Sequence, residues 1–399
     1  MTTPESNLAR FVLLPELVLL KDSRPHKGYV LCERRFVAQP CTRCGVVSDK
    51  GYDRRRVTLK DVPYNAEVGT LPMRLILLKR RLWCAPCGKP FTEAIPGCLP
   101  RRRTTERLRK LIMFACERYA SLSQVCREFG VSSDFVYNAF YEQLELKRRK
   151  DNQYPWPTAI GIDEHGFGRH QEYGRKAFVS LIVNQSKGKV MEVTFGKSQA
   201  ELEARLAHIP GRENVRFASI DMCDPYRNFI RSFFPNAEIV ADKFHVLRLL
   251  SVPILKERKR IVGKNADRRA RGLLLCSSKR LDYLDRLAIH RYLQKHPELH
   301  EMYMAKEALH SFYRTRGQRR AEVAFERMKE RFQASPVAEV RRLGRTLVNW
   351  RVEILNYFKT RMTNARLEGF NNKCSLVRRR AYGYRNPNNY RLRILSVCS

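Results

Sequence analysis

Three acidic residues that are far apart in the sequence have the chemistry to bind divalent cations together. Asp163 and Asp221 each end a short apolar segment that predicts a strand, and Glu368 lies in a predicted helix. Carboxylate oxygens are ligands that Mg²⁺ prefers, and a pair of such ions can stabilise the attacking and leaving oxygens of a phosphoryl displacement. These residue types therefore indicate metal-dependent phosphoryl transfer. Glu164 and Asp224 lie close to the first two acids in the sequence, and spacing alone leaves them open as alternatives.

Four cysteines indicate a second kind of metal site. They form two Cys-x-x-Cys pairs, each followed by a glycine: Cys41, Cys44, Cys84 and Cys87. Two such pairs supply the four thiolates of a tetrahedral zinc site, which leaves no open position and makes the zinc structural. A redox pair or buried cysteines without a metal are the alternatives. Cys32 and Cys98 flank this unit and are not needed for it.

The charge of the chain narrows the class of partner. Its 399 residues include 77 Lys and Arg against 40 Asp and Glu, a formal net charge of +37. Such an excess of positive charge favours binding to a polyanion. Nucleic acid is the first candidate, because basic side chains neutralise its phosphates. No apolar run reaches the roughly 18 residues of a membrane span, and the segment that could be a secretory signal is broken by proline and glutamate. We therefore exclude membrane and secreted classes and expect a cytoplasmic protein with reduced thiols.

The segment after the cysteines predicts a helix-turn-helix. Leu122–Phe129 repeats apolar residues at helical spacing, and Ser121 with Gln124 forms a capping-box pair at its start. Gly130 suits the turn, and Leu108–Tyr119 would be the supporting helix. The exposed positions near the start of the second helix would face a DNA major groove: Ser133, Asp134, Tyr137 and Asn138. The alternative is a helical hairpin with a purely structural role.

The central part of the chain alternates strands and helices in an informative order. Pro155–Pro157 predicts a linker, and the elements that follow it are three strands, a helix, a strand, a helix and a strand. They cover 159–163, 177–184, 190–195, 199–207, 215–221, 226–234 and 238–242. This is the order of an RNase H-like sheet, with acidic residues at strand ends. Residues 246–360 are then almost continuously helical and very basic.

The ordered combination of motifs resembles the ISL-three family of bacterial insertion-sequence transposases. Beyond the cysteine pairs and the helix-turn-helix, the matching motifs are Gly161–Glu164, Ser219–Met222, Ala241–Val246, Asn364–Asn372 and Arg380–Asn386. Single motifs of this kind are weak, but their order along nearly the whole chain is specific. The resemblance implies an α/β multidomain protein whose RNase H-like catalytic core contains a helical insertion.

The resemblance also assigns roles to residues. It implies that Asp163, Asp221 and Glu368 are a DDE triad holding two Mg²⁺ (or Mn²⁺), beside one structural Zn²⁺ at the cysteines. Asp242 and His245 form a DxxH pair with a supporting role, either orienting the site or holding the sheet edge. A basic cluster follows Glu368 and would approach the DNA backbone, although a solvated charge run is the alternative: Arg378, Arg379, Arg380 and Arg385.

The expected domains follow from these motifs. They are a zinc-binding domain (1–100), a helix-turn-helix domain (101–152), the first part of the core (158–250), the helical insertion (251–355) and the final part of the core (356–399). The implied activity is binding of terminal inverted repeats, followed by metal-dependent DNA cleavage and strand transfer.

Partners and rival functions complete the expectations. The expected partner is double-stranded DNA of the transposon ends and target, bound by a homodimer or a larger assembly at the bacterial nucleoid. The rivals are a catalytically inactive, transposase-derived DNA-binding regulator and an RNase H-type nuclease that cuts RNA–DNA hybrids.

Overall fold

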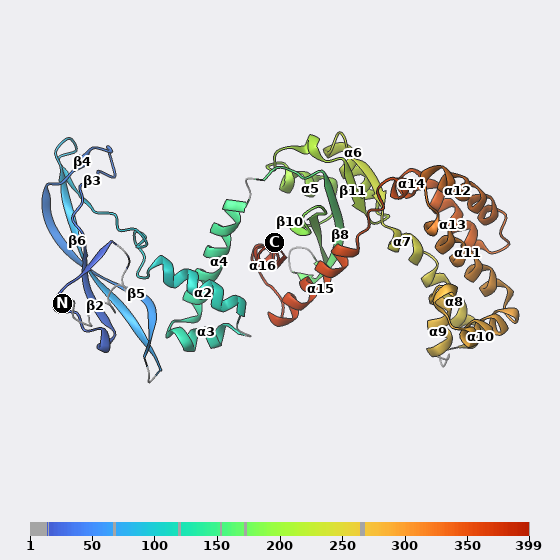
Figure 1. Cartoon of the computed structure of the whole chain (residues 1–399), viewed down its shortest axis with the longest axis horizontal. Coiled ribbons are helices and arrows are strands. Elements are labelled where there is room, and N and C mark those ends of the chain that lie inside the picture. The colour runs from blue at the N-terminus through green and yellow to red at the C-terminus, as the bar shows by residue number, and fades with distance from the viewer. Residues whose placement is uncertain are drawn as a thin grey trace. The chain divides into compact units, whose positions relative to one another are not determined.

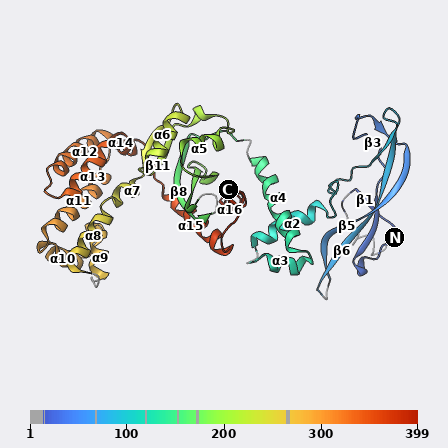
Figure 2. The ribbon, with the colours of Figure 1, turned by 180° about the vertical axis from the view of Figure 1, so that it is seen from behind.

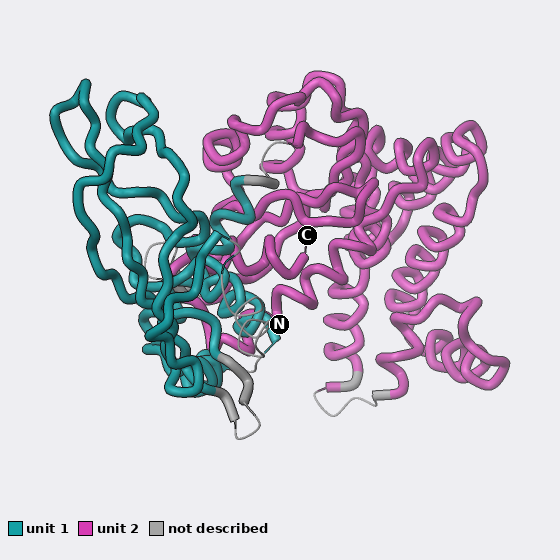
Figure 3. The backbone as a smooth tube through the Cα atoms, turned by 60° about the vertical axis from the view of Figure 1, so that its left-hand side comes forward, with its two compact units in different colours: residues 1–150 teal, residues 151–399 magenta. Residues whose placement is uncertain are grey.

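The computed structural model describes residues 14, 16–66, 69–118, 121–151, 154–170, 174–263 and 268–398. The chain divides into two compact units, residues 1–150 and 151–399, which Figure 3 shows in two colours. Each unit has its own secondary structure, labelled in Figure 1 and seen from behind in Figure 2.

The first unit is built on a sheet with one very long hairpin. Its strands are β1 (Leu17–Leu19), β2 (Tyr29–Arg34), β5 (Gly51–Ala66), β6 (Gly69–Cys84) and β7 (Lys89–Thr92), with a separate ribbon of β3 (Gln39–Pro40) and β4 (Val47–Ser48) and a 3-10 turn at Pro25–Lys27. The order is β1-β2-β6-β5, and β7 pairs with β6. One end of the β5–β6 hairpin lies beside the β3–β4 ribbon, because β4 contacts β6. This arrangement brings the two cysteine pairs together from distant parts of the sequence.

Three helices follow the sheet in the first unit: α2 (Glu106–Arg118), α3 (Leu122–Phe129) and α4 (Ser133–Asp151). The Ser121 hydroxyl caps α3 by accepting the Gln124 N–H, which is one of the two hydrogen bonds of the predicted capping box. Gly130 ends α3 in the left-handed conformation (φ 58°), which glycine adopts without steric cost. Leu122 is 36% exposed, so the apolar face is shorter than predicted. Tyr119, the predicted end of the supporting helix, lies outside the described residues.

The second unit contains a mixed sheet of five strands in the order β10-β9-β8-β11-β12. The strands are β8 (Ala159–His170), β9 (Gly174–Asn184), β10 (Lys189–Phe195), β11 (Phe217–Ile220) and β12 (Glu238–Ala241). β8, β9 and β10 are antiparallel neighbours, whereas β11 runs parallel to both β8 and β12. Helix α5 (Gln199–Leu206) precedes β11, and α6 (Asp224–Phe233) connects β11 to β12. The order along the chain is the predicted one.

One boundary prediction is wrong. The sequence predicts that the first strand ends at Asp163, but β8 continues to His170 because β9 remains hydrogen-bonded to it after the parallel partner β11 has ended. The predicted linker at Pro155–Pro157 belongs to no helix or strand and lies close to the boundary between the two units. It also contributes a core residue, since Trp156 is 2% exposed and packs against Phe233 and Phe234.

Helices cover both faces of the five-stranded sheet. One face packs against α5 and α6, and a 3-10 turn at Arg212–Asn214 leads from α5 to β11. The same core continues into a helical region, which contains a 3-10 turn at Ser278–Arg280 and the helices α7 (Lys243–Arg248), α8 (Ser251–Val262), α9 (Arg268–Leu275), α10 (Tyr283–Gln294), α11 (Pro297–Arg314), α12 (Gln318–Gln333), α13 (Ala338–Asn349) and α14 (Arg351–Thr360). The other face packs against α15 (Ala365–Arg380) and α16 (Pro387–Cys398). In Figures 1 and 2, α15 lies alongside β8. The last two helices thus return to the sheet after the inserted helices, which run from Lys243 to Thr360.

Candidate active site and metal centres

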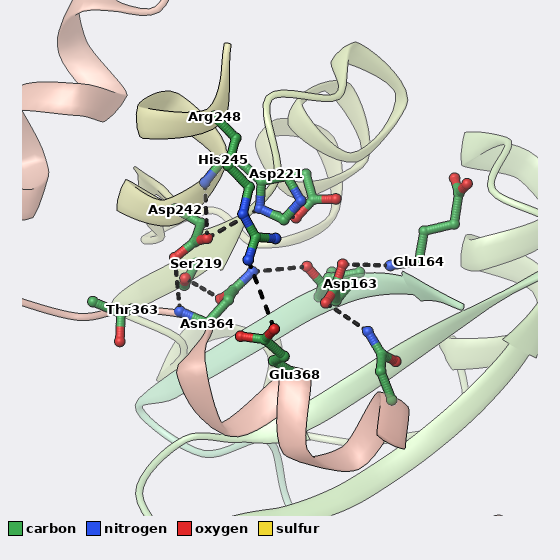
Figure 4. Close-up of polar contacts among 12 residues, drawn as sticks. Asp163, Glu164, Ser219, Asp221, Asp242, His245, Arg248, Thr363, Asn364 and Glu368 are labelled. Carbon is green, nitrogen blue, oxygen red and sulfur yellow. Dashed lines mark hydrogen bonds and ion pairs between the residues drawn. The ribbon is translucent and has the colours of Figure 1, made fainter. Parts of the chain in front are cut away.

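Strand register brings three aspartates to the same level of the sheet. Ile220 of β11 pairs with Ile162 of β8 on one side and with Ala241 of β12 on the other. The residues that follow these three are all acidic: Asp163, Asp221 and Asp242. Parallel neighbours end at the same edge of a sheet, so the three carboxylates emerge there together (Figure 4).

Asp163 and Asp221 form a close pair of carboxylates at this edge. Ligand atoms of both, together with one of His245, all lie within 4.8 Å of one another. Asp163 is 7% exposed; its Oδ1 accepts the Glu164 N–H at 2.8 Å and its Oδ2 accepts the Asn371 side-chain amide at 2.9 Å. Burial raises the pKa of Asp163. Burial, with the neighbouring Asp163 carboxylate, raises the pKa of Asp221 to about 7.

Asp242 and His245 form a tied pair beside these two acids. Asp242 is 1% exposed and caps α7 by accepting the His245 N–H. Its Oδ2 also lies 3.0 Å from His245 Nδ1, and this hydrogen bond raises the pKa of the imidazole. His245 Nδ1 lies 3.2 Å from Asp221 Oδ1 as well. A protonated His245 therefore offsets the negative charge of the aspartates when no cation is bound.

Asn364 connects the aspartates to the start of α15. It is 3% exposed, and its backbone N–H donates to Asp242 Oδ1 at 2.9 Å. Its side chain accepts a hydrogen bond from Ser219 of β11 and donates to the Ile162 carbonyl of β8 at 3.5 Å. One asparagine thus ties three strands to the helix that carries Glu368 (Figure 4).

Glu368 lies in the first turn of α15, apart from the paired aspartates. Its side chain is 63% exposed, and its Oε1 lies 3.7 Å from an Arg248 guanidinium nitrogen. Among the described residues, the group of close metal-ligand atoms contains Asp163, Asp221 and His245 but not Glu368. The structure therefore brings together two of the three predicted acids and leaves the third exposed on the adjoining helix.

A glycine allows α15 to approach β8 at this point. A Cβ on Gly161 would lie 2.7 Å from Cδ1 of Leu367 and 2.5 Å from Nε2 of Gln185. Leu367 is fully buried and directly precedes Glu368, so it has little room to move. Any side chain at position 161 would displace the start of the helix that carries the third acid.

The alternative acids point elsewhere. Glu164 extends away from the cluster in Figure 4 and pairs with Lys197 at 3.1 Å. It neighbours Asp163 on β8, and successive side chains of a strand point to opposite faces. The Asp224 side chain is 68% exposed at the start of α6, 3.9 Å from Arg227. Neither belongs to the group of close ligand atoms in the described chain.

Beside Asp163, the buried Asn371 Oδ1 has no hydrogen-bond partner in the described residues, and the nearby Asp221 Oδ1 lies 3.2 Å from His245 Nδ1. A buried polar atom without a partner is costly, and a cation satisfies it. The donor set is carboxylate and amide oxygen, which suits a hard cation such as Mg²⁺ or Mn²⁺. The residues present therefore fit a divalent cation at this edge.

Sequence reasoning missed Asn364 and Asn371 as site residues. Both lie in the matching segment 364–372, and they precede and follow Glu368 by one helical turn. Residues at i−4 and i+3 share a helix face, so polar residues at these spacings beside a candidate metal ligand were the available signal.

The four cysteines also come together. The Sγ atoms of Cys41 and Cys87 are 4.0 Å apart and those of Cys44 and Cys84 are 3.5 Å apart. Zinc–sulfur bonds of about 2.3 Å in a tetrahedron separate the sulfurs by about 3.8 Å, so the cluster fits one zinc ion. The backbone N–H groups of Arg43 and Cys44 lower the pKa of Cys41 to about 6, which favours a thiolate.

The two spare cysteines have a different environment. Cys32 and Cys98 lie in the core between the sheet strands and the following turn, 0% and 5% exposed. Burial raises the pKa of Cys32 to about 12. They are packing residues, separate from the four-cysteine cluster.

Comparison with known proteins identifies the family. The profile of the ISL3 family of DDE proteins, described as "Transposase", matches residues 160–394, more than half of the chain. The chain belongs to this transposase family. It is also 23% identical over 369 residues to the transposase for insertion sequence element IS1001 of Bordetella parapertussis, covering 89% of this chain and 87% of that protein. The resemblance drawn from the sequence is confirmed.

The predicted DNA-binding residues of this transposase lie on two surfaces, one in each unit. Ser133, Tyr137 and Asn138 are all exposed on the first turns of α4. Arg379, Arg380 and Arg385 are exposed at and beyond the C-terminal end of α15. Arg378 is half-buried, because its guanidinium donates to the Gly166 carbonyl of β8 at 2.6 Å. In the part of the transposase that the structure describes, no helix is long and apolar enough to cross a membrane.

Proposed function

We propose that the chain cleaves DNA at the ends of its insertion sequence and joins those ends to target DNA, with Asp163, Asp221 and Glu368 as the acidic triad. The observation that carries the proposal is the close pair of aspartates at one edge of the sheet, with the buried Asn371 Oδ1, which lacks a hydrogen-bond partner in the described chain, beside Asp163. Membership of the transposase family supports it.

Two Mg²⁺ or Mn²⁺ ions would be held by these three acids. When bound, they polarise the scissile phosphate and stabilise the attacking and leaving oxygens. Asp163 is preset for this role, because Asn371 and the Glu164 N–H fix its two oxygens. Glu368 is exposed, and within the described residues its carboxylate contacts Arg248 at 3.7 Å, which leaves it available as the third ligand.

The proposed reaction uses no protein nucleophile. Water attacks the phosphorus at the transposon end, and the 3′-oxygen leaves as a free 3′-hydroxyl. That hydroxyl then attacks a phosphodiester of the target in the same site. Asp242 and His245 support the site: Asp242 holds α15 through the Asn364 N–H, and a protonated His245 compensates the acids before cations bind.

The remaining parts of the chain have proposed roles in holding DNA. We assign residues 158–250 and 356–399 to an RNase H-like core, 251–355 to its helical insertion and 101–152 to a helix-turn-helix domain. The order of the five strands and the register of the aspartates support the first assignment. The capped α3, the Gly130 turn and the exposed start of α4 support the last, with Ser133, Tyr137 and Asn138 facing the major groove.

Zinc and self-association complete the proposal. One structural zinc would bind the four cysteines, which lie close together only in the folded domain of residues 1–100. Its binding free energy would therefore stabilise the folded state of this domain. Both transposon ends must be held together for strand transfer, so a homodimer or a larger assembly forms on double-stranded DNA.

The test is cleavage of labelled DNA carrying an end of the element, with Mg²⁺ or Mn²⁺. The wild-type protein should nick the end and join it to target DNA. Asp163→Asn, Asp221→Asn and Glu368→Gln should bind the end and lose cleavage by at least about a thousandfold, the scale for removing a group that acts in the transition state. Asp224→Asn is the matched control, because its exposed carboxylate is three residues from Asp221.

Two results would contradict the proposal. Full cleavage by a folded triad variant would remove that residue from the triad. Tight binding of paired ends by wild type without cleavage, in either metal, would instead identify the inactive DNA-binding regulator.

A further inference from the structure

A hollow at the end of α15 combines arginines with aromatic rings. It has a volume of about 700 Å³, and its walls come from β8, the last turn of α15 and the loop that leads to α16. Arg378, Arg379 and Arg385 contribute guanidinium groups, and the lining residues that the structure describes include no acid. A hollow of this size accepts a molecule the size of a nucleotide, and its charge selects an anion.

The floor of this hollow, which we call the α15 pocket, is a rigid aromatic layer. Tyr384 packs edge-on against the fully buried Tyr390, with ring centroids 5.1 Å apart. Tyr390 in turn contacts Phe167 at 5.0 Å, and Phe167 contacts Phe195 at 5.3 Å. The aromatic wall is thus fixed by the core between the sheet and α16.

Tyr382 is held at the rim of the α15 pocket in an unusual way. Helix α15 ends in a Schellman motif: the Tyr382 N–H donates to the Arg379 carbonyl and the Gly383 N–H donates to the Arg378 carbonyl. Tyr382 occupies the left-handed position of this motif (φ 53°), where glycine or asparagine is the usual residue. The ring is fully exposed, with a relative exposure of 102%.

The Schellman motif accounts for the left-handed backbone, but nothing in the described residues accounts for a tyrosine at this position or for its exposed ring. A bulky residue in the left-handed region is unfavourable, and an exposed ring contributes no packing that would offset it. Residues with strained backbone conformations that packing does not explain are concentrated at binding and catalytic sites. The ring is therefore available to contact another molecule, and it can stack on an aromatic face of that molecule.

We propose that the α15 pocket binds one unpaired nucleotide of the transposon-end DNA, with its base stacked on Tyr382 and its phosphate held by Arg379 and Arg385. This inference rests on the proposed function and adds a position-specific contact to it. Base–aromatic stacking tolerates any base, and guanidinium groups pair with phosphate oxygens. Arg378, hydrogen-bonded to Gly166 at 2.6 Å, holds the pocket against β8.

The position of the pocket indicates which nucleotide it takes. Arg378 is on the same helix as Glu368, and ten residues of α-helix span about 15 Å. At about 3.4 Å per nucleotide along B-form DNA, this corresponds to roughly four steps from the scissile phosphate. The nucleotide is therefore within a few positions of the cleavage site, where local unpairing gives the site access to the strand.

The experiment is a scan of end DNAs in which one nucleotide at a time, within about six positions of the cleavage site, is left unpaired by removing the opposite base. When a nucleotide is already unpaired, the protein does not have to open the duplex there. Wild type should therefore bind such DNA about tenfold more tightly than fully paired DNA when the unpaired nucleotide is at one or two adjacent positions. Tyr382→Phe should keep this preference, since stacking needs only the ring. Tyr382→Gly should lose it, although its fold is retained because glycine suits the left-handed position.

Controls separate the pocket from general DNA affinity. Tyr283→Ala removes another exposed ring (72% exposed), on α10, and should bind every DNA like wild type. Arg379→Ala should weaken the position-specific effect together with overall affinity.

The outcomes distinguish the two proposals. If wild type binds and cleaves the end but no unpaired position is preferred, or if Tyr382→Gly keeps the preference, the nucleotide pocket is wrong and the proposed function stands. If wild type neither cleaves nor selectively binds the end, the proposed function itself fails.

Discussion

Replacing Asp221 by asparagine should stabilise the protein when no divalent cation is present. The pKa of Asp221 is about 7, against an ordinary value of 3.8, because the carboxylate is buried beside Asp163. Each pKa unit corresponds to about 1.4 kcal/mol, so keeping this group charged at pH 8 costs the metal-free native state up to about 4 kcal/mol. Asparagine has the same shape and no charge, so the variant escapes this cost.

The sign of the pH dependence follows from proton binding. Between about pH 4 and pH 7 the native state keeps a proton on Asp221 that the unfolded chain has lost, so the free energy of unfolding falls as the pH rises through this window. The advantage of Asp221→Asn should therefore be small, about 0.5 kcal/mol, at pH 4 and near its full value at pH 8. For a unit of this size, 1 kcal/mol shifts the melting temperature by about 2 to 4 °C.

The assay is thermal unfolding of the full chain after dialysis into magnesium-free buffer at several pH values, without a chelator that would remove zinc. Mg²⁺ or Mn²⁺ at a hundred times the dissociation constant should then raise the free energy of unfolding of wild type by about 2.7 kcal/mol, and so raise its melting temperature. The same ions should have little effect on Asp221→Asn. Asp224→Asn, with its exposed carboxylate, should behave as wild type. A variant that is no more stable than wild type at pH 8 without divalent cation would refute the argument that this carboxylate is strained.

Further predictions concern positioning and zinc. Gly161→Ala should lower end cleavage by about ten- to a hundredfold, because it displaces α15. Gly272→Ala is the control, since its added Cβ meets nothing within 4 Å in the described chain, and it should cleave like wild type. Equal rates for the two variants would show that α15 tolerates the shift. Asn364→Ala should reduce cleavage and metal affinity by a similar factor, because the Ser219 hydroxyl loses its acceptor; unchanged metal titration would contradict this. Cys84→Ser should destabilise the first unit and lower its zinc content, measured by mass spectrometry, below one ion per chain. The control variant Cys126→Ser should keep its zinc. A full zinc content in Cys84→Ser would disprove the four-cysteine site.

Local patterns made much of this protein predictable from its sequence. The two cysteine pairs, the Ser121 cap and the Gly130 turn each depend on residues within a few positions of one another. The order of strands and helices in the second unit follows from alternating apolar segments in the same way. The family, too, was accessible, because its motifs are short segments in a fixed order.

Contacts between distant segments escaped sequence reasoning. β8 runs past Asp163 because β9 continues to pair with it, and no pattern within β8 reveals that partner. Trp156 lies in a segment with two prolines, yet its ring fills a gap beside Phe233 and Phe234. Burial of this kind depends on which surfaces meet.

The residue types available for chemistry can be read from the sequence: two aspartates after apolar strands, a glutamate in a helix, and four cysteines in pairs. How they combine depends on the folded arrangement. The register of β8, β11 and β12 aligns Asp163 with Asp221 and adds Asp242, while Asn364 fixes the start of α15 and leaves Glu368 exposed. The physical reason is that pKa, hydrogen bonding and metal fit depend on distances of a few ångströms, which long-range strand pairing sets and local sequence does not.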